Sequence, residues 1–142
     1  MWVTLVLTIK FIGTTLIQGG KRFKGGSRPP EDGAFSIAPA KVLQDFGVSP
    51  SSSQARLEDV RWQRIVHNDL ENIPLGIIVA WGSLLSCYSE RAHVALAVAF
   101  CLARILHTWA YAQALQPHRA IFYTIGLVCT LSLALNGLLG FF

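Results

Sequence analysis

Charged residues and cysteines are both scarce in this chain of 142 residues. Asp, Glu, Lys and Arg make up 14% of it, whereas a soluble domain contains about a quarter. The three cysteines are too few for a disulfide framework, and two of them lie in apolar runs, which favours ordinary buried thiols. The sequence also lacks a P-loop, a GxGxxG motif and paired histidines at metal-ligand spacing. These absences argue against a water-soluble globule, a disulfide-rich fold, and nucleotide or zinc sites of these types.

Apolar residues dominate instead. They form 52% of the chain, with a mean hydropathy of +0.45, which excludes disorder and is too apolar for a small domain in water. Apolar stretches of 17 to 24 residues occur at 2–18, 73–89, 92–115 and 120–142, and each can cross the hydrocarbon layer as a helix. We therefore predict a single membrane domain over 1–142, with spans at 2–18, 70–89, 92–115 and 120–142.

The first apolar stretch has an alternative interpretation as a secretory signal peptide. Against it, no basic segment precedes the stretch, Lys10 interrupts it, and a basic cluster, not a small-residue cleavage site, follows Gly20. We therefore expect a retained span. Lys10 would then either extend towards the membrane interface or pair with Glu71.

Basic residues gather between the first two predicted spans. Residues 19–69 hold eight of the twelve Lys and Arg and six of the eight Asp and Glu, a mixture that does not indicate a nucleic-acid patch. Arg119 lies in the short turn on the same side, whereas the opposite side has Arg91 and little else. The positive-inside rule therefore predicts that the 19–69 loop is cytosolic and that both termini lie across the membrane.

Within this loop, residues 25–30 and 49–53 are rich in Gly, Pro and Ser and are predicted to be irregular. From about Gln54 the pattern becomes helical and continues into the second span. Pro74 lies early in that span, so it should kink the helix or leave a carbonyl unpaired.

Three groups of polar side chains interrupt the spans or lead into them, although ionisable groups inside a membrane are costly and usually face a bundle interior. Within each group a spacing of three or four residues places the members on one helix face. The groups are Arg64, His67, Asn68 and Glu71; Arg104, His107, Thr108 and Tyr111; and Arg119 with Tyr123. Arginine forks fit carboxylates and a glutamate can take an ammonium, so the groups suit a small, multiply charged, peptide-like ligand.

Each group also has a structural alternative. Arg64 and Glu71 can form an interfacial ion-pair network, and Arg104 can tie two spans together. Arg119 can extend towards the interface, and Tyr123 can belong to an aromatic belt. The repetition of one chemistry on one predicted side of the membrane favours the ligand site over these separate explanations.

Two runs of residues resemble signatures of a known family. Residues 64–74 (RIVHNDLENIP) and 103–111 (ARILHTWAY) are similar to the second-helix and third-helix signatures of the membrane-associated proteins in eicosanoid and glutathione metabolism, the MAPEG family. Shorter similarities lie at Arg22, 30–32, 116–119 and Tyr123. The resemblance runs in order through about residues 5–140 and is closest to the branch of microsomal glutathione transferases and prostaglandin E synthases.

The resemblance implies an all-α, integral membrane four-helix bundle that forms a homotrimer and binds glutathione, as a co-substrate, between protomers. The residues implied to hold glutathione are Arg22, Arg64, His67, Asn68, Glu71, His107, Tyr111, Arg119 and Tyr123. Arg104 is implied to brace the site, and Arg119 and Asp32 to be catalytic. A free thiol has a pKa of about 8.5, and a neighbouring cation such as Arg119 lowers that pKa, so the reactive thiolate exists at neutral pH. No metal and no nucleic acid are implied.

The sequence departs from the prostaglandin synthase pattern at three places. His67 stands where that branch has an arginine, and Ala120 follows Arg119 where it has a serine. The chain between Glu71 and Pro74 is one residue shorter than the usual spacing. The first two differences favour a transferase that conjugates glutathione to lipophilic electrophiles from the bilayer, with peroxidase activity on lipid hydroperoxides.

Two other functions stay open: a glutathione-dependent prostaglandin E synthase, and a non-catalytic lipid-binding scaffold whose polar groups hold the trimer together. A channel or transporter is a more distant alternative, because no comparable charged cluster lines the far side of the membrane. The resemblance implies the endoplasmic reticulum or another internal membrane, such as the mitochondrial outer membrane, as the location.

Overall fold

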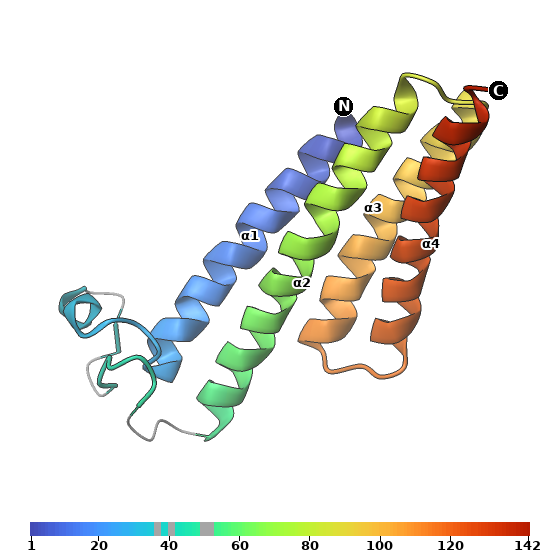
Figure 1. The fold of residues 1–142 in the computed structure, drawn as a ribbon. Helices are drawn as coiled ribbons and strands as arrows, with labels where there is room; N and C mark the ends of the chain where they lie inside the picture. Colours follow the sequence, from blue (N-terminus) through green and yellow to red (C-terminus); the bar gives the residue numbers. More distant parts are fainter. Residues whose placement is uncertain (36–37, 40–41, 49–52) are drawn as a thin grey trace. The chain divides into compact units, whose positions relative to one another are not determined.

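The computed structural model describes residues 1–35, 38–39, 42–48 and 53–142. These residues form four α-helices and one 3-10 helix, with no strand: α1 (Trp2–Gly25), η1 (Pro30–Ala34), α2 (Ser53–Leu84), α3 (Glu90–Ala112) and α4 (His118–Leu139) (Figure 1). Helices α1, α3 and α4 are each long and apolar enough to cross a membrane. The predicted all-α membrane fold is therefore confirmed.

Helix α2 differs from the other three helices. It starts at Ser53, which confirms the predicted onset near Gln54, and it continues without a break through Pro74 to Leu84. Proline has no N–H group, so one carbonyl a turn earlier lacks its usual helical donor. Among the described residues, α2 is not one of the helices that are long and apolar enough to cross a membrane. The predicted span at 70–89, of which α2 covers residues 70–84, stays a prediction.

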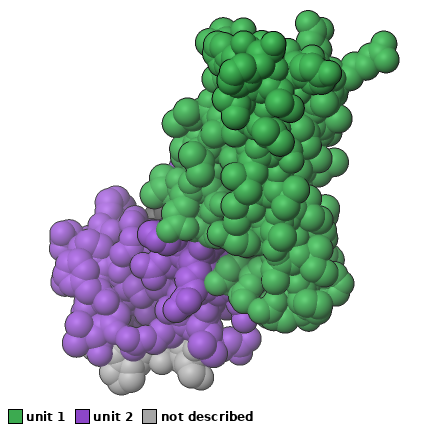
Figure 2. Space-filling view, turned by 45° about the vertical axis from the view of Figure 1, so that its right-hand side comes forward, with its two compact units in different colours: residues 1–10, 68–142 green, residues 11–67 purple. Residues whose placement is uncertain are grey.

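The chain divides into two compact units, coloured separately in Figure 2. Unit 1 consists of residues 1–10 and 68–142, and unit 2 of residues 11–67. Both α1 and α2 contribute residues to both units, so the boundary between the units cuts through two helices. The prediction of a single membrane domain stays a prediction, and each unit is described in turn.

Unit 1 contains the start of α1, the second part of α2, and all of α3 and α4, of which α3 and α4 lie side by side (Figure 1). Each of the four contributes buried apolar residues, among them Leu7, Ile73, Phe100 and Leu133. A Cβ added at Gly76 of α2 would meet the ring of Phe100, so glycine permits the close approach of α2 and α3. Large apolar side chains also point outward, such as Leu131 at 64% exposure, and lipid tails solvate such side chains well.

The connection between α2 and α3 is fixed to α4 through Asn136. The side-chain oxygen of Asn136 accepts from Ser89 N at 3.1 Å, and its Nδ2 donates to Ser89 O at 3.2 Å. The hydroxyl of Ser89 accepts from Ala92 N at 3.3 Å and so caps the start of α3. In Figure 1 this connection and both termini lie at the same end of unit 1.

In unit 2, α1 continues to Gly25, seven residues beyond the predicted end of the first span at 18. Gly26 then adopts a φ of 70°, a left-handed conformation that ends helices and favours glycine. Gln44 is 2% exposed, and its Nε2 donates to the carbonyl oxygen of Phe23 at 2.9 Å. This bond satisfies one of the last carbonyls of α1, which no helical N–H can reach.

The loop after α1 is irregular where the sequence predicts irregular chain. Of residues 25–30, only the first belongs to α1 and only the last to η1, and residues 26–29 lie in no helix. Between them, the guanidinium of Arg28 lies 4.6 Å from the ring centroid of Phe23, and its Nε pairs with Asp32 Oδ2 at 3.0 Å. Gly and Pro content indicates a turn but not the contacts that fix it. The other predicted irregular segment, 49–53, lies outside the described residues except for its last residue, where α2 begins.

Candidate functional site

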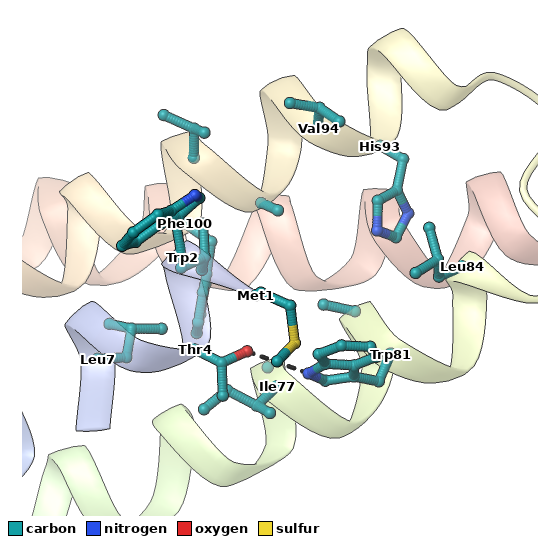
Figure 3. A pocket seen from close by; sticks show the side chains of 15 residues that line it. Met1, Trp2, Thr4, Leu7, Ile77, Trp81, Leu84, His93, Val94 and Phe100 are labelled. Carbon is teal, nitrogen blue, oxygen red and sulfur yellow. Dashed lines mark hydrogen bonds between the residues drawn. The ribbon is translucent and has the colours of Figure 1, made fainter.

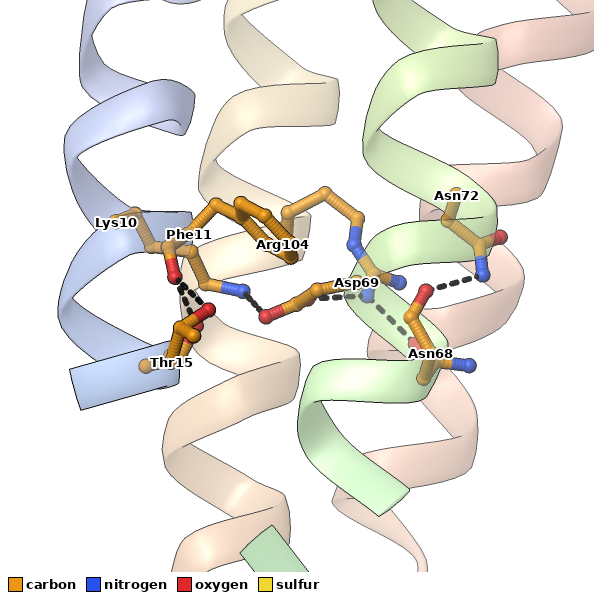
Figure 4. Close-up of polar contacts among 8 residues, drawn as sticks. Lys10, Phe11, Thr15, Asn68, Asp69, Asn72 and Arg104 are labelled. Carbon is orange, nitrogen blue, oxygen red and sulfur yellow. Dashed lines mark hydrogen bonds and ion pairs between the residues drawn. The ribbon is translucent and has the colours of Figure 1, made fainter. Parts of the chain in front are cut away.

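A network of charged and amide side chains joins three helices in the interior of unit 1 (Figure 4). Asp69 of α2 is 0% exposed, and its two oxygens bind two cations. Arg104 Nη2 of α3 lies 2.8 Å from Oδ1, and Lys10 Nζ of α1 bonds to Oδ2. The same Nη2 atom of Arg104 donates to Asn68 Oδ1 at 2.6 Å. Burying such charges is tolerable only because they are paired.

Asp69 is the functional residue that sequence reasoning missed. The sequence places the polar face of α2 at residues 64, 67, 68 and 71, and it predicts that Lys10 either extends towards the membrane interface or pairs with Glu71. The structure pairs Lys10 with Asp69 instead. A signal was present, because Asp69 lies four residues from Ile65 and four from Ile73, and both are buried. A carboxylate on an apolar helix face requires a buried partner.

A second cluster of predicted site residues lies where α3 ends and α4 begins. His107 is 2% exposed, and its ring centroid lies 5.8 Å from that of Tyr111 and 6.2 Å from that of Tyr123. The guanidinium carbon of Arg119 lies 4.5 Å from the ring centroid of Tyr111, a cation–π arrangement. The pairing of α3 with α4 therefore brings together four residues that sequence resemblance proposed for one ligand.

Three predicted site residues on α2 have exposed side chains: Arg64, His67 and Glu71. Glu71 belongs to unit 1, and Arg64 and His67 belong to unit 2. Their spacing places them on one face of a helix whose opposite side buries Ile65 and Ile73. Their side chains are thus accessible on the surface of the chain.

The two remaining predicted site residues, Arg22 and Asp32, make contacts within the loop that follows α1. Arg22 Nη2 donates to the carbonyl oxygen of Ser27 at 3.1 Å. The carboxylate of Asp32 forms the ion pair with Arg28 described above. A catalytic role for Asp32 stays a prediction.

Helix α3 carries three buried polar atoms without a hydrogen-bond partner among the described residues: Arg104 Nε, His107 Nδ1 and Thr108 Oγ1. Buried polar groups are nearly always paired, so this stretch of α3 has unused hydrogen-bonding capacity. Within the same described residues, no group of three His, Cys, Asp or Glu side chains is placed to hold a metal ion.

Unit 1 also contains an apolar pocket of about 380 Å³ between the start of α1, the second part of α2 and the first half of α3 (Figure 3). Trp2, Ile77, Val94 and Phe100 are among its lining residues. Its polar groups include the indole of Trp81, whose Nε1 donates to Thr4 Oγ1 at 3.0 Å. The pocket lies on the N-terminal side of Arg104 along α3, whereas the aromatic cluster lies on its C-terminal side.

The sequence pattern of the MAPEG family matches residues 1–139, nearly the whole chain. This protein belongs to the MAPEG family. MAPEG proteins are membrane helical bundles and include glutathione transferases and related enzymes, so the match agrees with the all-α fold and covers every site residue discussed above. No curated protein matched the chain.

Proposed function

We propose that this MAPEG protein is a membrane-bound glutathione transferase that conjugates glutathione to lipophilic electrophiles. The observation that carries the proposal is the cluster at the junction of α3 and α4, where Arg119 stacks on Tyr111 and the ring of His107 contacts both tyrosines. A fixed cation beside phenol groups favours an anion there, and a glutathione thiolate is such an anion.

The peptide part of glutathione is proposed to bind polar side chains of α1 and α2. Glu71 suits its ammonium group, and Arg64 suits a carboxylate, because the guanidinium fork matches carboxylate geometry. Asn68 offers an amide, and Arg104 braces it through the bond at 2.6 Å. Arg22 and His67 are the further candidates for peptide contacts. We propose that glutathione binds where protomers of a homotrimer meet, since this α2 face is exposed on the protomer.

The proposed reaction is attack by the thiolate on an electrophilic carbon. The thiol first loses its proton to solvent, and Arg119 stabilises the resulting anion. The sulfur then forms a bond to carbon while the leaving group departs with its electron pair. With a lipid hydroperoxide, the thiolate attacks the O–O bond instead, and a second glutathione completes the reduction to alcohol, water and glutathione disulfide. The protein contributes charge stabilisation and proximity in both reactions.

The apolar exterior of α1, α3 and α4 supports delivery of lipophilic substrates through the bilayer. We propose an internal membrane such as the endoplasmic reticulum as the location, with the 19–69 loop in the cytosol. The loop holds most of the basic residues of the chain, as the positive-inside rule requires.

The test compares two reactions of the protein purified in detergent. We expect glutathione-dependent conjugation of a chloronitrobenzene to exceed isomerisation of a prostaglandin endoperoxide, because alanine follows Arg119. Arg91→Ala serves as a control variant. It should keep the conjugation activity of the wild type, since Arg91 is an exposed arginine at the first turn of α3. Endoperoxide isomerisation without conjugation would identify a synthase instead, and glutathione binding without either reaction would identify a scaffold.

A further inference from the structure

Arg104 determines which way the side-chain amide of Asn68 faces. A guanidinium carries only donors, and Arg104 Nη2 lies 2.6 Å from the side-chain oxygen of Asn68. The amide oxygen must therefore be the atom that faces Arg104. The NH₂ group of the same amide points to the other side of the contact and can donate to a carbonyl or carboxylate of a ligand.

Asp69 in turn holds the guanidinium at the position from which it reaches Asn68. One oxygen of Asp69 accepts from Arg104 Nη2 at 2.8 Å, and the other oxygen bonds to Lys10 Nζ (Figure 4). Arg104 is 1% exposed and Asp69 0%, so solvent does not compete for these contacts. One Arg104 nitrogen thus binds Asp69 and Asn68 together, while its Nε has no partner among the described residues.

Lys10 prevents a competing geometry. Arginine and a carboxylate prefer a two-bond fork that uses both carboxylate oxygens. Here Lys10 bonds to Oδ2, and Arg104 Nη2 bonds to Oδ1 and to Asn68 Oδ1 with the same nitrogen. Without the ammonium, Oδ2 would attract a second guanidinium nitrogen, and the guanidinium would rotate away from Asn68.

We propose that Lys10 and Asp69 are positioning residues for the glutathione site: through Arg104 they fix the Asn68 amide so that its NH₂ group faces the bound peptide. The proposal rests on the proposed function, because glutathione is the ligand that Asn68 is expected to contact. Lys10 itself lies on α1 and acts through two intermediate side chains.

The test uses Lys10→Met, which keeps the apolar stem and removes the ammonium. We expect the KM for glutathione to rise about tenfold, because the hydrogen bond from the Asn68 NH₂ group to glutathione would be lost. The kcat should change less than about twofold. Lys10→Arg should restore the wild-type KM, because a guanidinium can also occupy Asp69 Oδ2. Lys21→Met is the matched control: Lys21 lies on the same helix as Lys10 and pairs with Glu58 of α2 in unit 2, with both side chains partly exposed.

Activities are compared at equal amounts of folded protein, so that a loss of stability alone leaves KM unchanged. Lys10→Gln serves if Lys10→Met does not fold, because glutamine keeps a donor for Asp69 without the charge, and a raised KM is expected there too. An unchanged KM in the folded variant, or a fall in kcat alone, would overturn the positioning role. If the wild-type protein itself does not bind glutathione, the proposed function fails and this inference fails with it.

Discussion

Among single residues, Arg119 is the one to which we assign stabilisation of the thiolate. Its guanidinium stacks on Tyr111, near the buried ring of His107, and no other cation is so placed among the described residues at the junction of α3 and α4. The stack fixes the position of the charge without neutralising it. The cation can therefore stabilise an anion brought by a ligand.

We predict that Arg119→Ala lowers glutathione conjugation by about 100-fold or more, as removal of a preorganised charge stabiliser does. The thiolate absorbance of bound glutathione should disappear at neutral pH, because the thiol pKa returns towards ~8.5. Arg119→Lys should retain part of both signals. Turnover and thermal unfolding are measured on the same preparations, and full turnover in a folded Arg119→Ala protein would remove Arg119 from the mechanism.

Asp69 is a single residue on which the stability of the fold should depend. Asp69→Asn leaves Lys10 and Arg104 as buried cations without an anion, and breaking a buried pair in this way costs about 3–5 kcal/mol. We predict a loss of that size in the free energy of unfolding, measured in detergent. Glu90→Gln, at an exposed position in the first turn of α3, is the control and should change it by less than about 0.5 kcal/mol. Equal stability of the two variants would contradict the structural role of the network.

At the scale of elements, close contacts of glycines set the distance between α2 and α4. A Cβ added at Gly137 of α4 would lie 2.6 Å from Ser83 Cβ and 2.8 Å from Ser83 Cα. Real Cβ atoms do not approach backbone so closely, so an alanine here must displace one helix. The hydrogen bonds of Asn136 to Ser89 lie next to this contact, so the displacement would also strain the α2–α3 connection.

We therefore predict that Gly137→Ala lowers the free energy of unfolding by about 1–3 kcal/mol, the usual cost of overpacking. Gly82→Ala is the matched control, because Gly82 is a helical glycine of α2 with nothing within 4 Å of an added Cβ. That control should be neutral or stabilising by up to ~1 kcal/mol, since alanine favours helix. Thermal unfolding of both variants in detergent measures these changes. A Gly137→Ala protein as stable as the wild type would contradict the close packing of α2 and α4.

The pairing of α1 with α2 in unit 2 should depend on pH. A hydrogen bond from Lys21, together with its positive charge, lowers the pKa of Glu58 below its ordinary value of 4.5. A lowered carboxyl pKa adds stability above the pKa of the unfolded chain and loses it as the pH falls through the folded pKa. Local stability of unit 2 should therefore decrease below about pH 4.5.

Limited proteolysis of the loop at 26–48, followed as the pH is lowered, measures this stability. In Lys21→Met the pKa of Glu58 returns towards its ordinary value, so we expect this acid-dependent part of the loss to shrink. The effect will be small, because both side chains are partly exposed. An identical pH profile in the variant would show that the Lys21–Glu58 pair does not contribute.

At the scale of the whole molecule, apolar runs were sufficient to predict an all-α membrane protein, and the onset of α2 near Gln54 followed from its polar–apolar periodicity. Helical spacing also grouped His107 with Tyr111. The role of Asp69 could not be read in the same way, because its partners Lys10 and Arg104 are 59 and 35 residues away. Periodicity identifies which face of a helix a residue shares, but pairing between distant helices depends on packing.

We propose that this MAPEG protein binds glutathione and holds its thiol as a thiolate. A difference ultraviolet spectrum of the detergent-purified protein, titrated with glutathione at neutral pH, tests this proposal. We predict a saturable thiolate absorbance that Arg119→Ala abolishes and Arg91→Ala preserves. Saturable binding without thiolate absorbance, or no binding at all, would contradict the claim.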